Sequence, residues 1–366
     1  ATVIGVSGSA GKTTTKEMMA HIFGGRWKTL FTHGNLNNLF GLPMTLMRLD
    51  ETHEMAIIET GMNQPRELAR LTEIAEPDIA IVTNIGNAHI GNFGSLENLI
   101  RCEGEILEQM TPDGTAILNA DCPNVRRLPD FVSMPETKVT FGLSSEADVR
   151  AESINPIKPF GYEFRLCAHG EAEYIHLNVY GRYQIYNALA AVAAALTAGM
   201  SLNEAAGHLL EFHPPKLRSQ TEWVDGILLI ADCYNASPDA TIKSLHSLSD
   251  VSGIRRRVAL LGSMNELGGQ SEQLHRETGR AVAEEKIDML CAYGEMAGWI
   301  AEEAECGGVV VYRFGDPEET ANFLAKNLRE GDALLVKASR TVGLENVVER
   351  MRDLRRAHLV ELAAKE

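Results

Sequence analysis

The stretch GVSGSAGKTTTKEMM, residues 5–19, joins a short apolar run to a helical segment through a glycine-rich turn. Residues 2–6 are mostly β-branched and apolar and predict a buried strand, whereas residues 12–23 are rich in helix formers. A strand, a tight loop and a helix in this order direct backbone N–H groups and a positive helix end at one point, which favours a bound phosphate. The stretch therefore predicts a phosphate-binding loop at the start of an α/β domain.

Lys12 and Thr13 carry the chemistry of this loop. Lys12 would reach the terminal phosphates of a nucleotide, and the Thr13 hydroxyl would ligate Mg²⁺. Val6 stands where the common pattern GxxxxGK[ST] has its first glycine, so the stretch fits the shorter form [ST]GxxGK[ST]T. The alternative is a glycine-rich turn with an exposed lysine. The residues that we expect to contact the nucleotide here are Ser9, Gly11, Lys12, Thr13 and Thr14.

The composition is typical of a globular protein, since 45% of the 366 residues are hydrophobic and 23% are charged. This length predicts two domains, or three small ones, each with its own core. No apolar run reaches membrane-spanning length, no secretory signal is visible, and the six cysteines form no C-x-x-C pair. We therefore expect a cytoplasmic protein that does not insert into membranes. The net charge of −16 argues against a nucleic-acid partner.

Short β-rich runs alternate with helical segments, which predicts an α/β fold with a mostly parallel sheet. In the first part we expect strands at 55–59, 79–84 and 115–119, helices at 66–74, 96–110 and 185–198, and an antiparallel hairpin over 162–179. Two prolines in HPPKLRSQTEW, residues 213–223, suggest a domain joint. Later strands are expected at 227–231, 258–261, 289–292, 309–312 and 333–337. We predict a phosphate-loop domain over residues 1–215 and a second, Rossmann-like α/β domain over residues 216–366.

Two further polar residues follow predicted strands of the first domain. Glu59 ends the apolar run MAIIE, and His89 follows the run that ends in VTN after a short loop. Ligand sites of parallel sheets lie at the carboxyl ends of the strands. A carboxylate and an imidazole there could both face a metal bound to phosphates. The alternatives are a helix-capping Glu59 and a His89 that is bonded only to the backbone.

Several motifs, in chain order, resemble those of the Mur ligases. They include SGSAGKTTTKEM, GNLNNLFGLPMTLMRL, AIIETGMNQPREL, IVTNIGNAHIGNFGSLENL and LNADCP, and later PPKLRS, IADCYNASPDA, LLGSMNELGGQSEQLH and LLVKASRTVGLENV. The resemblance covers nearly the whole chain. It is closest to the family members that add D-alanyl-D-alanine to a muramoyl tripeptide in peptidoglycan synthesis.

The resemblance implies an ATP- and Mg²⁺-dependent ligase for small-molecule carboxylate and amine substrates. The γ-phosphate of ATP passes to a carboxylate, an amine attacks the acyl phosphate, and phosphate is expelled. In the family pattern Thr13 and Glu59 serve one Mg²⁺, His89 belongs to a second, and Lys12 neutralises the phosphates.

The resemblance also implies contacts with the nucleotide and the two other substrates. Asn187 corresponds to an adenine contact, Arg218 to a phosphate contact and Asp232 to a ribose contact. The remaining positions implied by the family pattern are Tyr234 and Asn235 beside the nucleotide, and Asn37, Asn38, Lys337, Ser339 and Arg340 beside the substrates.

Glu103 departs from the family pattern, in which a lysine carrying a CO₂-derived carbamate helps to hold the second Mg²⁺. Because a carbamate ends in a carboxylate-like group, we expect Glu103 to replace it directly. The alternative is an exposed helix glutamate beside a weakly held second metal. Other departures near the implied sites are Leu39, Phe40, Tyr183, Gln184, Ala231, Ala338, Val342 and Gly343.

Three functions stay open from the sequence. The first is the D-alanyl-D-alanine-type ligase, and the second is a stand-alone Mur-like ligase that joins an amino acid to a non-UDP carboxylate in specialised metabolism or cofactor assembly. The third is a catalytically silent, ATP-binding paralogue that acts through a partner. The UDP-sugar-binding N-terminal domain of the closest members has no counterpart ahead of Ala1. We therefore expect either a longer ligase, a partner subunit that supplies this part, or a donor without UDP.

Overall fold

The computed structural model describes residues 1–86 and 90–363, and it divides into two compact units. The first unit holds residues 1–157, 161–178 and 182–213, and the second holds 158–160, 179–181 and 214–366. Within the described ranges, no helix is both long and apolar enough to cross a membrane.

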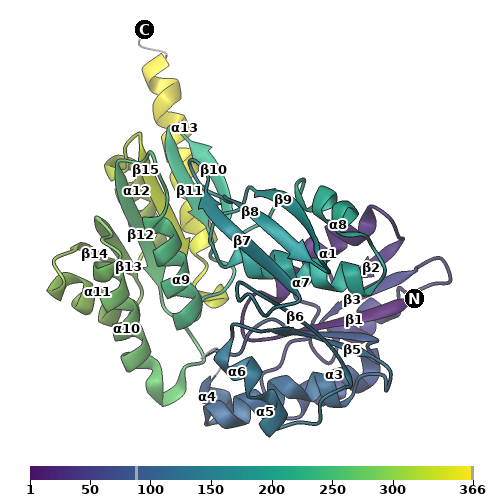
Figure 1. The fold of residues 1–366 in the computed structure, drawn as a ribbon. Coiled ribbons are helices and arrows are strands. Elements are labelled where there is room, and N and C mark those ends of the chain that lie inside the picture. Colours follow the sequence, from purple (N-terminus) through teal and green to yellow (C-terminus); the bar gives the residue numbers. More distant parts are fainter. Residues whose placement is uncertain (87–89, 364–366) are drawn as a thin grey trace. The chain divides into compact units, whose positions relative to one another are not determined.

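The first unit is built on a mostly parallel sheet with strand order β2-β3-β1-β4-β5-β6-β7-β8-β9 in the described residues (Figure 1). Its strands are β1 (Thr2–Ser7), β2 (Thr29–Phe31), β3 (Met55–Glu59), β4 (Ile79–Val82), β5 (Thr115–Asn119), β6 (Thr137–Gly142), β7 (Val149–Pro156), β8 (Tyr162–Ala168) and β9 (Glu171–Leu177). Strands β8 and β9 pair antiparallel, which confirms the predicted hairpin. Strands β2, β6 and β7 were not predicted.

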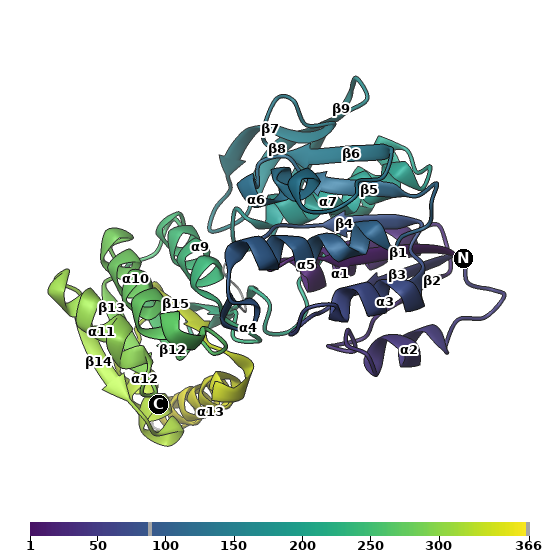
Figure 2. The ribbon, with the colours of Figure 1, turned by 90° about the horizontal axis from the view of Figure 1, so that it is seen from below.

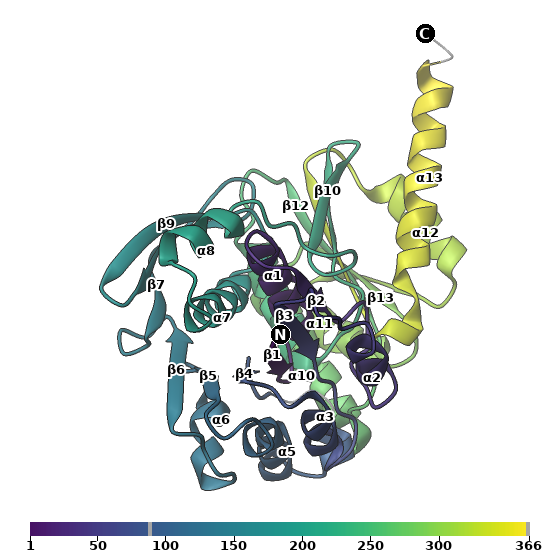
Figure 3. The same ribbon diagram turned by 90° about the vertical axis from the view of Figure 1, so that its right-hand side faces the viewer.

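Helices cover both faces of the first sheet. They are α1 (Lys12–Gly24), α2 (Gly41–Leu46), α3 (Glu67–Ala75), α4 (Ile90–Phe93), α5 (Leu96–Glu108), α6 (Pro123–Arg126), α7 (Gln184–Thr197) and α8 (Leu202–Leu209), with a 3₁₀ turn at Leu128–Asp130. Figure 3 shows the strands from β6 to β2 in a row, with α1, α7 and α8 on one side and α3, α5 and α6 on the other. Apolar side chains of α3 and α5 pack on the sheet and exclude water from one of its faces.

Strand β1 is central and brings three strand ends together. Val6 pairs with Glu59 of β3, and Ser7 pairs with Val82 of β4, both in parallel register. The phosphate-binding loop leaves the end of β1 directly after Ser7. The carboxyl ends of β1, β3 and β4 therefore meet at the edge where parallel sheets place ligands.

The second unit has a sheet of strand order β10-β11-β15-β12-β13-β14, again counting only described residues. Its strands are β10 (Gln220–Val224), β11 (Ile227–Ala231), β12 (Arg256–Gly262), β13 (Met289–Tyr293), β14 (Val310–Phe314) and β15 (Asp332–Lys337). All neighbours pair in parallel except β10 and β11. Strand β10 begins inside the segment that we expected to be only a joint.

Helices also cover both faces of the second sheet (Figure 2). One face is covered by α9 (Pro238–Ser249), α10 (Ser271–Glu284) and α11 (Ala297–Cys306), and the other by α12 (Pro317–Asn327) and α13 (Leu344–Ala363). Short 3₁₀ turns lie at Gly268–Gln270 and Arg340–Val342. This sheet with helices on both faces, together with the first, confirms the predicted α/β fold class.

His275, on α10, fixes the loop that follows β12. Its ring is fully buried, its Nε2 accepts the Met264 N–H at 2.9 Å, and its Nδ1 lies 2.7 Å from the Ser271 carbonyl. Since a carbonyl only accepts, Nδ1 carries the proton and the ring is neutral. Burial lowers the pKa of His275, and the hydrogen bond to Ser271 opposes this effect.

This environment predicts a pH-dependent stability of the second unit. A histidine with a lowered folded-state pKa stabilises the fold above its unfolded pKa of about 6.5. That contribution is lost as pH falls, because the unfolded chain takes up the proton first. We expect the free energy of unfolding to fall by up to about 1.4 kcal/mol per pH unit below this pH. Denaturant unfolding, monitored by tryptophan fluorescence, measures this change.

The His275→Gln variant should lose this part of the pH dependence. The matched control is His246→Gln, which changes an exposed histidine on α9 that pairs with Glu285. Equal pH slopes for the wild type and the His275→Gln variant would contradict the assignment.

Candidate functional site

The loop between β1 and α1 has the backbone of a phosphate cradle. Gly8 and Gly11 have φ angles of 130° and 87°, in the region that favours glycine. A Cβ atom on Gly11 would lie 2.4 Å from Asn187 Oδ1, so a side chain here would collide with α7. Lys12 folds back in this structure, and its ammonium donates to the carbonyl of Gly8.

Residues after β4 brace this loop from the side. Asn84 accepts the Ala10 N–H at 3.1 Å and donates to the Ala10 carbonyl at 2.7 Å. The Thr83 hydroxyl donates to the same carbonyl at 2.7 Å. Thr83 and Asn84 were not predicted as site residues, although they end the strand run before His89. The available signal was their position at the carboxyl end of a buried strand.

Glu59 is the last residue of β3 and lies next to Thr13, at the start of α1. The residue is only 2% exposed, and its Oε1 accepts from the Thr13 hydroxyl at 3.1 Å and from the Asn37 amide at 2.9 Å. Oε2 is buried and has no hydrogen-bond partner among the residues that the structure describes. A buried carboxylate oxygen without a partner is costly, which indicates that a ligand completes this site.

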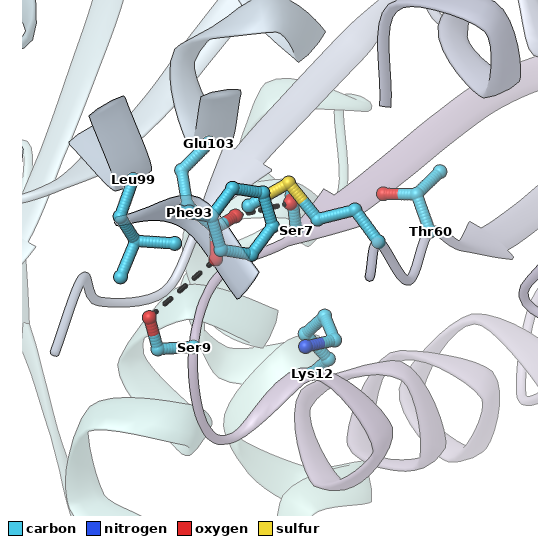
Figure 4. A pocket seen from close by; sticks show the side chains of 8 residues that line it. Ser7, Ser9, Lys12, Thr60, Phe93, Leu99 and Glu103 are labelled. Carbon is cyan, nitrogen blue, oxygen red and sulfur yellow. Dashed lines mark hydrogen bonds between the residues drawn. The ribbon is translucent and has the colours of Figure 1, made fainter. Parts of the chain in front are cut away.

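Glu103 lines a small pocket beside the loop (Figure 4). Its Oε2 accepts from the Ser7 hydroxyl at 2.6 Å, and Ser9 Oγ lies 3.5 Å from Oε1. The residue is 3% exposed, so the alternative of an exposed helix glutamate is wrong. Burial raises the pKa of Glu103, and the positive charge of Lys12 and the hydrogen bond from Ser7 oppose this effect.

The pocket is polar on one side and apolar on the other. Its lining residues are Ser7, Ser9, Lys12, Thr60, Met62, Phe93, Leu99 and Glu103. Figure 4 shows the Glu103 carboxylate directed toward Ser7 and Ser9, with the ring of Phe93 beside it. The apolar wall lowers the local polarity and strengthens interactions between charged groups there.

The oxygen donors around Thr13 and Glu59 are of the type that Mg²⁺ prefers. No cluster of three or more histidine, cysteine or acidic side chains able to hold a metal occurs in residues 1–86 and 90–363. His89, the predicted ligand of a second metal, lies outside the described residues. The structure brings Thr13 and Glu59 together, and it places Glu103 beside Ser7 and Ser9 at the phosphate-binding loop.

Asn187, Thr14 and Asn38 were also predicted as site residues of the first unit. Asn187 packs against Gly11, accepts from Thr15 Oγ1 at 3.4 Å and donates to Gln184 at 2.7 Å. Thr14 is buried in α1. Asn38 accepts the N–H of Gly41 at 2.9 Å and so caps the start of α2.

In the second unit, Asp232 and Lys337 form a buried ion pair at the ends of β11 and β15. The Lys337 ammonium donates to Asp232 Oδ2 at 2.6 Å and to the Asn235 carbonyl at 3.2 Å. The other carboxylate oxygen accepts the Ser219 N–H at 2.9 Å, and Ser244 Oγ lies 3.4 Å from Oδ2. Both charged groups are therefore satisfied inside the protein.

Tyr234 lies beside two guanidinium groups in the same unit. The Arg218 Cζ is 4.0 Å and the Arg340 Cζ is 5.8 Å from the centre of the Tyr234 ring. Arg340 also pairs with Glu345. Two cations at one aromatic ring form a surface suited to anions.

Ser339 joins two loops of the second unit. Its hydroxyl accepts the Asn265 N–H at 2.9 Å and lies 3.4 Å from the Ala236 carbonyl. Asn235 is exposed, and its amide oxygen accepts the N–H of Ala236. The structure thus brings Ser339 and Asn235 into one loop cluster with Tyr234 and Lys337. Asn265 was not predicted, and only its place in the quoted motif LLGSMNELGGQSEQLH marks it.

Comparisons with known proteins agree with this arrangement. Residues 6–195 match the Mur ligase middle domain, and residues 218–340 match the Mur ligase, glutamate ligase domain. The UDP-N-acetylmuramoyl-tripeptide--D-alanyl-D-alanine ligase of Bacillus subtilis (strain 168) is 32% identical over 350 residues, which are 95% of this chain and 75% of that protein.

Two solved structures share the fold over nearly the whole chain. A crystal structure of MurF from Acinetobacter baumannii has a TM-score of 0.87 and 31% identity, and covers 96% of this chain and 76% of that chain. MurF ligase from Thermotoga maritima, crystallised in complex with ADP, has a TM-score of 0.86 and 26% identity, and covers 98% of this chain and 81% of that chain.

The resemblance predicted from the motifs is confirmed by these matches, and so is the prediction of a ligase. The first matched domain contains the phosphate-binding loop together with Glu59 and Glu103. From its sequence and its fold, this chain belongs to the Mur ligase family.

Proposed function

We propose that this protein is an ATP-dependent ligase that joins a D-alanyl-D-alanine-type amine to a peptide carboxylate of a peptidoglycan precursor. The observation that carries the proposal is the contact between the Thr13 hydroxyl and the buried Glu59 carboxylate at the phosphate-binding loop. The similarity to relatives named as UDP-N-acetylmuramoyl-tripeptide--D-alanyl-D-alanine ligases supports the substrate class. ATP as the energy source is supported by the ADP complex of the Thermotoga maritima relative.

The proposed reaction has three steps, which are formation of an acyl phosphate, attack by the amine to give a tetrahedral intermediate, and expulsion of phosphate from that intermediate. The γ-phosphoryl group of ATP moves to the substrate carboxylate, which gives an acyl phosphate and ADP. The amine nitrogen then attacks the acyl carbon, the amide forms, and inorganic phosphate leaves as the amine loses a proton. Bringing a carboxylate to a polyphosphate places anions side by side, so the site must supply positive charge.

The residues of the first unit suit this task. The N–H groups of the loop and the start of α1 bind phosphate oxygens, and Lys12 exchanges the Gly8 carbonyl for the terminal phosphates. Thr13 and Glu59 would hold Mg²⁺, which neutralises phosphate charge when bound. Asn187 lies against the same loop, and we assign the base contact to it from the family pattern.

In the second unit, we assign the nucleotide and acceptor contacts to the surface around Tyr234. Arg218 and Arg340 supply charge for phosphate or carboxylate groups. Ser339 and Asn235 lie in the same loop cluster. We assign a positioning role to the Asp232–Lys337 pair, because each of its charged groups is already bonded within the protein.

We place the reaction in the cytoplasm as part of the same proposal. All six cysteines are free thiols, as is typical of reducing compartments.

Phosphate release from ATP tests the reaction. We expect release only when D-alanyl-D-alanine and UDP-N-acetylmuramoyl-tripeptide are both present. Release with a free peptide acid in place of the UDP-linked donor would favour the stand-alone ligase. Binding of ATP without release under any of these conditions would favour the silent paralogue and overturn the proposal.

Substitution of Glu59 tests the site. The Glu59→Gln variant keeps the side-chain size but loses the negative charge, and we expect turnover to fall by at least about 100-fold. The matched control is Glu73→Gln, which changes an exposed glutamate of α3 that pairs with Arg70. Wild-type turnover and Mg²⁺ dependence in the Glu59→Gln variant would be incompatible with the proposed role.

We assign to Glu103 the part that a lysine carbamate has in the family pattern. The support is its burial, its direction toward Ser7 and Ser9, and its place in one pocket with Lys12 (Figure 4). A genetically encoded carboxylate needs no CO₂ for its formation. The activity of this protein should therefore not respond to bicarbonate.

Variants of Glu103 separate this role from simple packing. We expect turnover of the Glu103→Gln variant to fall by about 10- to 100-fold, because the carboxylate near the metal is lost. In the Glu103→Lys variant, added bicarbonate should restore part of the activity, whereas the wild type should be unaffected. A Glu103→Gln variant with unchanged turnover and metal dependence would remove Glu103 from the site.

A further inference from the structure

Lys16 is a fully buried lysine that the proposed chemistry does not use. It lies on α1, one turn after Lys12, with 0% exposure. Its ammonium donates to the Thr32 carbonyl at 2.7 Å, pairs with Glu17 Oε1 at 2.6 Å, and lies 5.7 Å from the ring centre of Phe31. Burying an ammonium costs free energy unless such partners compensate it.

The residue that Lys16 holds is itself bonded to Glu59. Thr32 directly follows β2 and is also fully buried. Its N–H donates to the Ile57 carbonyl at 3.0 Å, and its hydroxyl accepts the Glu59 N–H at 3.0 Å. Thr32 therefore links the Lys16 ammonium to the backbone of Glu59.

The loop that starts at Thr32 makes a second contact with Glu59, through Asn37. Asn37, in this loop, donates to Glu59 Oε1 at 2.9 Å, and its carbonyl accepts the Gly61 N–H at 2.8 Å. The loop thus touches Glu59 at its backbone and at its carboxylate. Lys16 anchors the start of this loop to α1, the helix that carries Thr13.

We propose that Lys16 is a positioning residue, which acts through Thr32 and holds the Glu59 carboxylate beside Thr13, where the two side chains would bind a divalent metal. Outer partners of metal ligands orient the ligands and change metal affinity by about 10- to 100-fold. Lys16 touches neither a substrate nor the metal. This inference rests on the proposed metal site at Thr13 and Glu59.

The test measures metal binding directly. Mn²⁺ is titrated into the protein in the presence of ADP, and the free ion is followed by electron paramagnetic resonance. We expect the Lys16→Met variant to bind Mn²⁺ about 10- to 100-fold more weakly than the wild type. The matched control is Lys28→Met, which removes an exposed lysine next to Asp50 and should leave the affinity unchanged.

A second variant keeps the test decisive if Lys16→Met does not fold. Thr32→Val retains the backbone carbonyl that Lys16 needs but removes the hydroxyl that accepts from Glu59. This variant should also weaken Mn²⁺ binding. The double variant should bind no more weakly than the weaker single variant, because both changes interrupt one path.

The outcomes separate two failures. A wild type that binds no Mn²⁺ would overturn the metal site itself and, with it, the role of Lys16. If the wild type binds Mn²⁺ and a folded Lys16→Met or Thr32→Val variant binds it with the same affinity as the wild type, only the positioning role is overturned. Thermal unfolding of each variant shows whether it is folded at the temperature of the titration.

Discussion

Two carboxylates, Glu59 and Glu103, are removed from water beside one glycine-rich loop, and this constraint shapes the first unit. A buried carboxylate is costly unless hydrogen bonds or positive charges compensate it. Thr13 and Asn37 bond to one oxygen of Glu59, and Ser7 bonds to Glu103. Among the residues that the structure describes, the other oxygen of Glu59 has no hydrogen-bond partner, and the cation of the proposed site would bind there.

The parallel sheet supplies the geometry that these groups need. Strands β1, β3 and β4 end at one edge, so residues far apart in sequence become neighbours without long loops. The loop itself is held by Thr83 and Asn84 from one strand and by Asn187 from α7. These contacts restrict the conformations of the loop, and a restricted loop loses less entropy on binding.

The second unit uses its charges differently. Asp232 and Lys337 compensate each other inside the fold, and so they organise the loop that carries Tyr234. Arg218 and Arg340 lie at the ring of Tyr234 and provide the positive charge on that loop's surface. Arg340 is also paired with Glu345, so its charge is partly compensated within the protein. The family pattern assigns Asp232, Lys337 and the two arginines to ligand contacts. It does not reveal that Asp232 and Lys337 are bonded to each other inside the fold.

The sequence by itself determined the α/β class, the phosphate-binding loop and the family, because glycine spacing, strand alternation and several ordered motifs are local patterns. It also singled out Thr13, through the phosphate-loop pattern, and Glu59, because a polar residue at the end of a buried strand is a local signal. Only the tertiary structure decided that Glu103 is buried against Ser7, and that Lys16 holds Thr32. These contacts join residues 96 and 16 positions apart, and they depend on how helices pack on the sheet. A local pattern does not specify which face of a helix meets which strand end.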